Sequence, residues 1–245
     1  QITATWSAPT GGASNYKVYV DAGTSSPTTL RTTQSGTSYA QTGLSRNTQY
    51  GFRIITVGGG GDLSAYSSNT SLYTLPDVPL NLAVDGTPTG DSIDLTWDAP
   101  PGGASNYKLE YRQYPFGSFS LYSTQSNTFD TVDFLTSGTQ YAFRVAATNA
   151  DGAVGATTAQ IIGQTDVGKS DRRLKTNIER IGYSDMNIPI YLFNYKDDLN
   201  TTYQGVMAQD LLEMGLKDAV VMEDDGYYAV FYNKIDVNQI RINNN

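Results

Sequence analysis

The chain has 245 residues, with 24 acidic and 16 basic side chains, so its formal net charge is −8. This charge argues against a nucleic-acid partner, because binding to phosphate backbones needs a basic face. Cysteine and histidine are both absent, which excludes disulfides, thiolate or imidazole metal sites and any histidine-dependent catalytic triad. We expect no cofactor and no metal. No apolar run approaches the roughly 20 residues of a membrane span, so we expect no membrane insertion.

One sequence module occurs twice in the first two thirds of the chain. The heptapeptide Gly11–Lys17 returns unchanged as Gly102–Lys108. The same offset aligns Trp6 with Trp97 without a gap. Self-similarity at a fixed offset indicates repeated structural units. We therefore expect two copies of one domain, at residues 1–75 and 76–165, joined by a linker that contains prolines.

The two copies differ at their beginnings. The second copy opens with an apolar segment, Pro79–Gly86, that is expected to form a first strand. The first copy has no residues to match it. We therefore expect the first domain to lack its first strand, and a longer protein to extend beyond Gln1.

Within each copy the pattern favours short strands. Apolar and polar residues alternate, which is typical of half-buried strands. Turn-forming Gly, Pro, Asn and Asp residues separate the alternating segments. Short strands at such regular spacing predict a β-sandwich. The clearest strands of the second copy are Ile93–Trp97, Tyr107–Tyr111 and Tyr141–Val145.

Several of these residues resemble a fibronectin type III domain. They are the Trp97 strand, the Tyr107–Tyr111 strand, and the segments Leu135–Tyr141 and Asn149–Gly152. The resemblance implies two tandem immunoglobulin-like sandwiches and a mostly β chain. It also implies tyrosine corners at Tyr50 and Tyr141, whose hydroxyls bond back to the upstream backbone.

The second copy carries aromatic residues that the first copy lacks at the aligned positions. Exposed rings could stack on sugars or fill a partner's pocket, and Tyr114 and Phe116 are our candidate binding aromatics for a host-surface glycan. The alternative is that the neighbouring Phe119 and Tyr122 simply face the core.

The last segment, residues 166–245, has a higher density of charged residues and is expected to be a separate, small α+β domain. Leu174, Ile178 and Ile181 have helical spacing. The remaining elements are expected in chain order as a strand at Ile190–Tyr195, a turn at Asp197–Asn200, a helix at Val206–Met214, and a hairpin of Ala219–Met222 with Tyr227–Tyr232.

The motifs of this segment are similar to the C-terminal intramolecular chaperone of bacteriophage tail spikes and fibres, the endosialidase type. The matching residues are Ser170–Ile178, Tyr195, Gly205–Leu211 and Val230–Asn233. The resemblance implies a homotrimer, assembled with upstream fibre or other virion proteins, and self-cleavage immediately before the first serine. It assigns Ser170 as the nucleophile, Lys175 as the base, and the Lys169–Ser170 bond as the bond that is cut.

A serine–lysine pair is chemically reasonable in a chain without histidine. The lysine acts as a base only if its pKa falls from about 10.4 towards neutrality. Burial lowers this pKa, as does nearby positive charge from Arg172 or Arg173. Five residues along a helix place two side chains on different faces, so Ser170 must precede the helix or the lysine must come from a neighbouring subunit. Alternatively, Ser170 and Asp171 cap a helix and Lys175 is a solvated charge.

These observations lead us to expect a structural virion protein, part of a phage tail fibre, spike or appendage that serves host attachment. It is expected to assemble in the host cytoplasm and to act as a single-turnover serine autoprotease, without an external substrate. The alternative is a secreted bacterial adhesin or glycan-binding module with fibronectin-type spacers.

Overall fold

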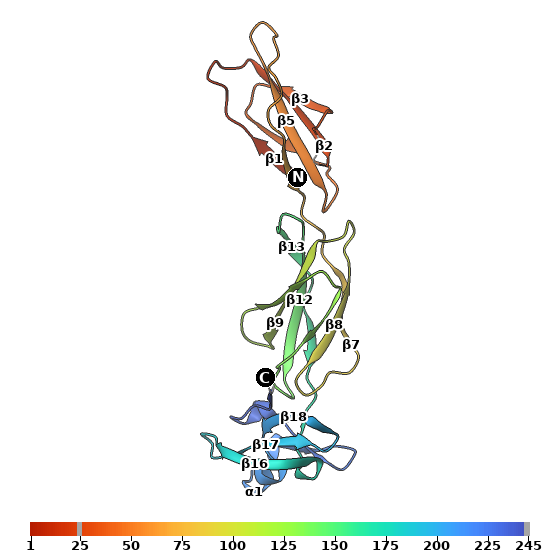
Figure 1. Cartoon of the computed structure of the whole chain (residues 1–245), viewed down its shortest axis with the longest axis vertical. Coiled ribbons are helices and arrows are strands. Elements are labelled where there is room, and N and C mark those ends of the chain that lie inside the picture. The colour runs from red at the N-terminus through yellow and green to blue at the C-terminus, as the bar shows by residue number, and fades with distance from the viewer. Residues whose placement is uncertain (24–25, 243–245) are drawn as a thin grey trace.

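The computed structural model describes residues 1–23 and 26–242. Three β-rich bodies follow one another along the long axis of the molecule, and the third is the shortest along that axis (Figure 1). The first two are β-sandwiches and the third combines small sheets with one short α-helix. The expectation of a mostly β chain with two immunoglobulin-like sandwiches and a small C-terminal domain is confirmed.

The first domain packs a two-stranded sheet against a four-stranded sheet. Alternation in β2 (Asn15–Ala22) buries Tyr16, Val18 and Val20 on one face, and Val18 and Val20 pack with Phe52 of the central strand β5 (Gln49–Val57). The sheets are β1 (Ile2–Thr5) with β4 (Ser38–Gln41), and β3 (Leu30–Gln34), β2, β5 (Gln49–Val57) and β6 (Thr70–Tyr73) in that order.

The second domain repeats this arrangement with one more strand in the smaller sheet. The expected first strand is present as β7 (Leu80–Asp85), which pairs antiparallel with β8 (Ile93–Asp98). In the described part of the first domain, β1 pairs with β4 only. The sheets are β11 (Phe129–Val132), β8 and β7, and β10 (Ser120–Gln125), β9 (Asn106–Gln113), β12 (Gln140–Thr148) and β13 (Val154–Thr157), with β14 (Ile161–Gln164) also on β12.

Both expected tyrosine corners are formed. The backbone N–H of Ser45 donates to the Tyr50 hydroxyl at 3.1 Å, and that of Thr136 donates to the Tyr141 hydroxyl at 2.9 Å. Trp97 is 2% exposed at the centre of the second core. The repeated aromatic residues therefore have a packing role.

The third domain holds two sheets and a core of its own. Helix α1 (Ala208–Glu213) buries Ala208 and Leu211 against the hairpin of β19 (Val220–Met222) and β20 (Tyr228–Val230). Its sheets are β16 (Lys175–Tyr183), β17 (Pro189–Tyr195), β18 (Asp198–Gly205) and β21 (Ile240–Ile242), and β15 (Gly168–Lys169), β20 (Tyr228–Val230) and β19 (Val220–Met222). Single 3₁₀ turns lie at Arg172–Leu174, Lys217–Ala219 and Tyr232–Lys234.

The helix expected around Leu174, Ile178 and Ile181 is wrong. After one 3₁₀ turn the chain enters β16, which pairs with β17. The register shifts twice along this pair, once between Thr176 and Glu179. Each irregularity breaks the period of two, so a bulged strand shows helix-like spacing of its apolar residues. The expected four-residue turn is also shorter, because β18 already begins at Asp198.

Hydrogen bonds join neighbouring domains. At the first junction the Tyr73 N–H donates to Asp151 Oδ2 at 2.7 Å, and Asn149 Nδ2 donates to Thr74 O at 3.2 Å. At the second junction Asn233 Nδ2 donates to Gly138 O at 3.4 Å. The third domain therefore touches the second domain close to residues 168–170.

Candidate functional site

The backbone on both sides of the Lys169–Ser170 bond is held by the third domain. Strand β15 pairs antiparallel with β20, Gly168 opposite Val230 and Lys169 opposite Ala229. The N–H of Ser170 donates to Tyr228 O at 3.0 Å, and its carbonyl accepts from the N–H of Ala208 at 2.8 Å. Hydrogen bonds to the third domain therefore hold this part of the chain in place on both sides of the bond.

The side chain of Ser170 lies in the domain interior. Its exposure is 0%, and its Oγ lies 2.9 Å from the hydroxyl of Tyr232. The Tyr232 hydroxyl also accepts from the N–H of Val206 at 3.3 Å. A β-carbon on Gly205 would lie only 2.7 Å from that hydroxyl, so glycine is needed for the ring to reach Ser170.

Lys175 is the first residue of β16 and is 3% exposed. Its Nζ donates to Val206 O at 2.7 Å and lies 3.7 Å from the centroid of the Phe193 ring. Burial, and then the positive charge of Arg172, lower the pKa of Lys175 well below its usual value. The alternative that Lys175 is a solvated charge is therefore wrong.

The structure brings Ser170 and Lys175 of one chain to the same buried place. Ser170 precedes the 3₁₀ turn and Lys175 follows it at the start of β16, so the helix assumed in the five-residue spacing argument is absent between them. The Ser170 hydroxyl contacts Tyr232, Tyr232 contacts the N–H of Val206, and Lys175 contacts the carbonyl of the same Val206. Both side chains are therefore anchored at the backbone of Val206 inside one protomer, Ser170 through the Tyr232 hydroxyl and Lys175 directly.

The capping role is taken by Asp171. Its side chain accepts from the N–H of Arg173 at the start of the 3₁₀ turn, as well as from Gln209 Nε2 and the Tyr228 N–H. Burial alone would raise the pKa of Asp171, but hydrogen bonds from Arg173 and these neighbours hold it well below its usual value. Arg173 is therefore tied to a carboxylate, and Arg172 is the cation that influences Lys175.

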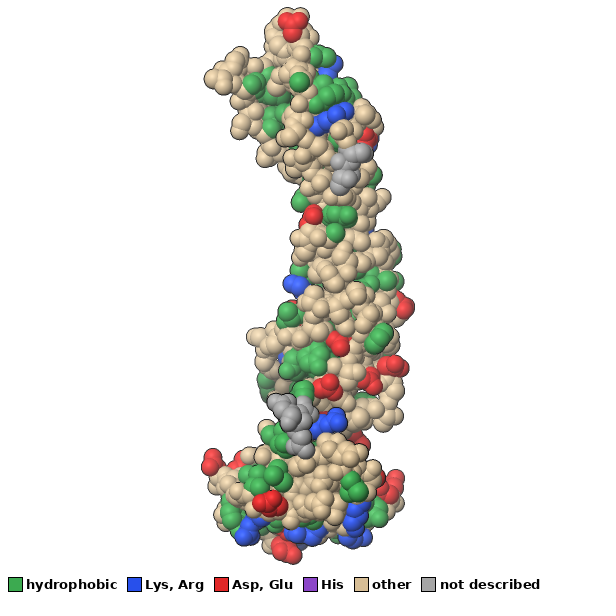
Figure 2. Space-filling model, in the orientation of Figure 1, with side chains coloured by type: hydrophobic (Ala, Val, Ile, Leu, Met, Phe, Trp, Pro, Cys, Tyr) green, Lys and Arg blue, Asp and Glu red, His purple; other side chains and the backbone are tan. Residues whose placement is uncertain are grey.

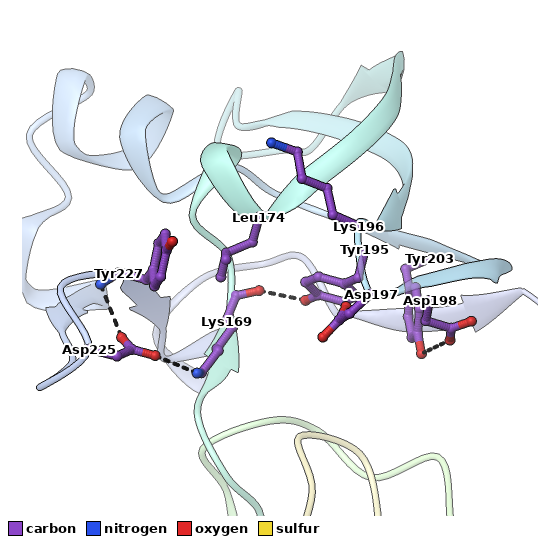
Figure 3. A pocket seen from close by; sticks show the side chains of 9 residues that line it. All are labelled: Lys169, Leu174, Tyr195, Lys196, Asp197, Asp198, Tyr203, Asp225 and Tyr227. Atoms are coloured by element: carbon purple, nitrogen blue, oxygen red, sulfur yellow. Dashed lines mark hydrogen bonds and ion pairs between the residues drawn. The ribbon is translucent and has the colours of Figure 1, made fainter.

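An open hollow of about 540 Å³, lined by Lys169 and Tyr195 among others, lies beside the Lys169 carbonyl (Figure 3). The Tyr195 hydroxyl donates to the carbonyl oxygen of Lys169 at 2.5 Å. The side chain of Lys169 forms an ion pair with Asp225 across 2.6 Å. The Lys169–Ser170 bond therefore has the buried Ser170 side chain on one side and an open hollow on the other, next to Lys169.

Sequence reasoning did not assign Tyr195, Tyr232 or Val206 to the site. Tyr195 and Tyr232 belong to the motifs that carried the resemblance, but nothing in the sequence shows which atoms they touch. Val206 takes part through its backbone, which no residue type reveals.

The candidate binding aromatics lie on the second domain, away from Ser170. Phe116 is 82% exposed and Tyr114 is 37% exposed, and both line a hollow of about 550 Å³. Phe119 is covered by the Arg144 guanidinium at 4.1 Å, and Tyr122 packs on the domain core. Phe119 and Tyr122 are therefore packing residues, and the two exposed rings are free of that role.

No other site type emerges from the described residues. Within residues 1–23 and 26–242, no group of three or more metal-ligating side chains gathers. None of the described helices is long and apolar enough to cross a membrane.

Two family models match the chain. The fibronectin type III domain matches residues 1–72 and 77–164, and the chaperone of endosialidase matches residues 170–221. Neogenin from Rattus norvegicus is 30% identical over 166 residues, which are 62% of this chain and 12% of that protein. Chitinase A1 from Niallia circulans is 31% identical over 168 residues, 63% of this chain and 22% of that protein. The matched region thus spans less than a quarter of these relatives.

Solved structures also align with the sandwich domains. A two-domain fibronectin type III segment of chicken tenascin has a TM-score of 0.40 at 16% identity, covering 66% of this chain and 89% of that chain. The FN5 domain of Drosophila Lar has a TM-score of 0.33 at 23% identity, covering 38% of this chain and all of that one.

Proposed function

Since the chain belongs to the fibronectin type III family and carries a chaperone of endosialidase domain, we propose that it is a structural protein of a phage virion. It forms part of a tail fibre, spike or appendage used in host attachment. Its third domain drives assembly of a homotrimer in the host cytoplasm and then cuts the chain between Lys169 and Ser170. The two sandwiches are the shaft or adhesive portion of the mature product.

The observation that carries this proposal is that Ser170 and Lys175 are both buried in the interior of the third domain. A lowered lysine pKa means that the amine is neutral for a larger fraction of molecules near pH 7, and only the neutral amine accepts a proton. Ser170 adjoins the peptide bond that would be cut. The site is thus suited to one reaction on its own chain.

The reaction proceeds in two steps, formation of an ester on Ser170 and hydrolysis of that ester. In the first step Ser170 Oγ bonds to the carbonyl carbon of Lys169, and the hydroxyl proton passes to the Lys175 amine. Lys175 then gives this proton to the backbone nitrogen of Ser170 as the C–N bond breaks, which leaves an ester between Lys169 and Ser170. Water then hydrolyses the ester. The products are a carboxylate at Lys169 and a free amine and hydroxyl at Ser170.

Folding must come before cutting in this arrangement. Ser170 is hydrogen-bonded to Tyr232, and Lys175 is bonded to the carbonyl of Val206, 31 positions further along the chain. An unfolded chain has neither the lowered lysine pKa nor the fixed backbone. Cleavage after assembly would also make the product kinetically stable, because unfolding is then no longer the reverse of assembly.

Denaturing mass spectrometry of the purified chain tests the proposal. The wild type is expected to give two fragments, one beginning at Ser170. Ser170→Ala and Lys175→Met are expected to leave the chain intact. Ser120→Ala and Lys217→Met are the matched controls and should cleave normally. Ser120 is exposed on the second domain, and Lys217 is exposed on the third domain outside the hollow beside Lys169. An intact wild-type chain would contradict self-cleavage, and a monomer at micromolar concentration by light scattering would contradict the trimer.

The second candidate function is that of an adhesin or glycan-binding module with fibronectin-type spacers. The exposed rings of Tyr114 and Phe116 beside a hollow favour it. Phe116→Ala is then expected to weaken binding to a glycan array roughly tenfold, which corresponds to about 1.4 kcal/mol. Phe129→Ala is the control, because Phe129 is 62% exposed elsewhere on the same domain. Equal binding by both variants and the wild type would rule out this glycan site.

A further inference from the structure

We propose that Tyr195 is a third catalytic residue of the same cleavage, and that its hydroxyl stabilises the oxyanion that forms on the Lys169 carbonyl when Ser170 attacks. The inference rests on the proposed self-cleavage. It adds the electrophilic half of the site, because Ser170 and Lys175 supply only the nucleophile and the base.

The hydrogen-bond geometry fixes the direction of the Tyr195 hydroxyl. Gln239 Nε2 donates to the Tyr195 oxygen at 3.0 Å, so the phenol already accepts a hydrogen bond there. Its own hydrogen is directed to the Lys169 carbonyl oxygen, 2.5 Å away. Figure 3 shows this contact, with the Tyr195 ring reaching from the end of β17 towards the Lys169 backbone.

The ring is held rigidly where it is needed. Phe193 packs edge-on against the Tyr195 ring with centroids 5.4 Å apart, and Tyr203 does so at 5.1 Å. A donor fixed in advance loses no energy to reorganisation when charge develops on the oxygen. Burial, followed by the neighbouring Tyr232, raises the pKa of Tyr195. The residue therefore keeps its proton and acts as a hydrogen-bond donor across the whole neutral range.

The carbonyl lies between two different environments. The Ser170 side chain lies on the buried side of the Lys169 carbonyl, whereas Tyr195 lines the open hollow on the other side. In the first step the C=O electrons move onto oxygen, where the Tyr195 hydroxyl donates to the negative charge. They return as the C–N bond breaks. In the second step water reaches the ester from the hollow, and the same donor stabilises the second oxyanion.

Tyrosine-to-phenylalanine variants of the full chain test the proposal. Each chain is synthesised in a cell-free reaction with a short radioactive pulse, and the fragment beginning at Ser170 is followed over time on denaturing gels. Loss of one oxyanion donor costs on the order of 100-fold in rate, which is the slowing expected for Tyr195→Phe. Tyr183→Phe is the matched control, because Tyr183 is 52% exposed on β16 of the same domain and its ring contacts Arg180, outside the site. It should cleave at the wild-type rate.

A second measurement separates catalysis from a structural role. Site-specific replacement of Tyr195 by 3,5-difluorotyrosine makes the phenol more acidic and a stronger donor while keeping its shape. Cleavage is then expected to be faster than in the wild type. Melting temperatures, compared in the uncut Ser170→Ala background, are expected to be similar for the fluorinated and wild-type proteins.

The outcomes distinguish the two proposals. If the wild type cleaves, Ser170→Ala does not, and Tyr195→Phe cleaves at the wild-type rate, the role of Tyr195 is overturned while self-cleavage stands. A rate that does not respond to phenol acidity also overturns it. If the wild type never cleaves, both proposals fail together.

Discussion

Lys175 and Asp171 are both buried, but their surroundings favour opposite charge states. Lys175 has burial and a nearby arginine lowering its pKa, so its neutral amine is favoured. Asp171 collects hydrogen bonds from Arg173, Gln209 and the Tyr228 backbone, which keep its pKa low and its carboxylate charged. Four positions along the chain thus separate a lysine whose neutral form is favoured from an aspartate whose charged form is favoured. Environment, not residue type, decides each role.

The lowered pKa of Lys175 makes folding dependent on pH. The unfolded lysine titrates near 10.5, so below that pH the unfolded chain binds more protons than the folded one. Stability of the third domain is therefore expected to be full above about pH 10.5, and to fall with decreasing pH by up to about 1.4 kcal/mol per unit until the lower, folded pKa is reached.

Urea unfolding of the third domain at several pH values measures this dependence in the uncut Ser170→Ala background. Lys175→Met removes the titrating group and keeps an unbranched side chain. The variant is expected to lose the pH slope, and its stability relative to the parent should be higher at pH 6 than at pH 9. Lys196→Met, at an exposed position, should keep the slope of the parent. A parent without any slope between these pH values would contradict the buried, neutral lysine.

At the scale of elements, alternation of residue types predicted most of the strands. The strands around Trp97, Tyr107 and Tyr141 are formed as expected, because each buries one face in a sandwich. The segment after Leu174 was wrongly predicted to be helical, because two register irregularities in β16 allow apolar residues at intervals of four and three. Pairing with β17 makes this segment a strand, and the residue pattern of the segment alone does not reveal that pairing.

The candidate site was only partly predictable for the same reason. Ser170 and Lys175 were assigned through a resemblance to a family. Their contacts come from distant elements, since Tyr232 lies 62 positions beyond Ser170 and Val206 lies 31 positions beyond Lys175. The carbonyl donor Tyr195 lies 26 positions beyond Lys169. Only the fold brings these strands together, so no local motif could predict the geometry.

At the scale of the whole molecule, the three domains form an elongated body in which charged side chains gather on the C-terminal domain (Figure 2). The first junction is tightly built. Gly155 on β13 lies against the linker, where a β-carbon would be 2.7 Å from the carbonyl oxygen of Pro76. Pro76 and Pro79 restrict the linker backbone further. We therefore expect the two sandwiches to move together.

Gly155→Ala tests the stiffness of this junction. The added methyl group forces the linker away from β13, so the hydrogen bond between Asp151 and the Tyr73 backbone is expected to weaken. Small-angle scattering should then report a shorter maximum dimension and a broader distribution of shapes. Gly11→Ala is the control, because a β-carbon there meets nothing within 4 Å. Identical scattering curves for both variants would show that the contact does not hold the domains in line.

The antiparallel pairing of residues 168–169 with Ala229 and Val230 does not depend on the covalent bond that follows it. Breaking that bond would therefore change the connectivity of the molecule before it changed its shape. The new carboxyl end at Lys169 would stay paired with β20 and in contact with Tyr195 until force or a competing strand displaced it. A cut molecule would then keep its size and shape under native conditions. Dissociation of the C-terminal domain would be a separate and slower step.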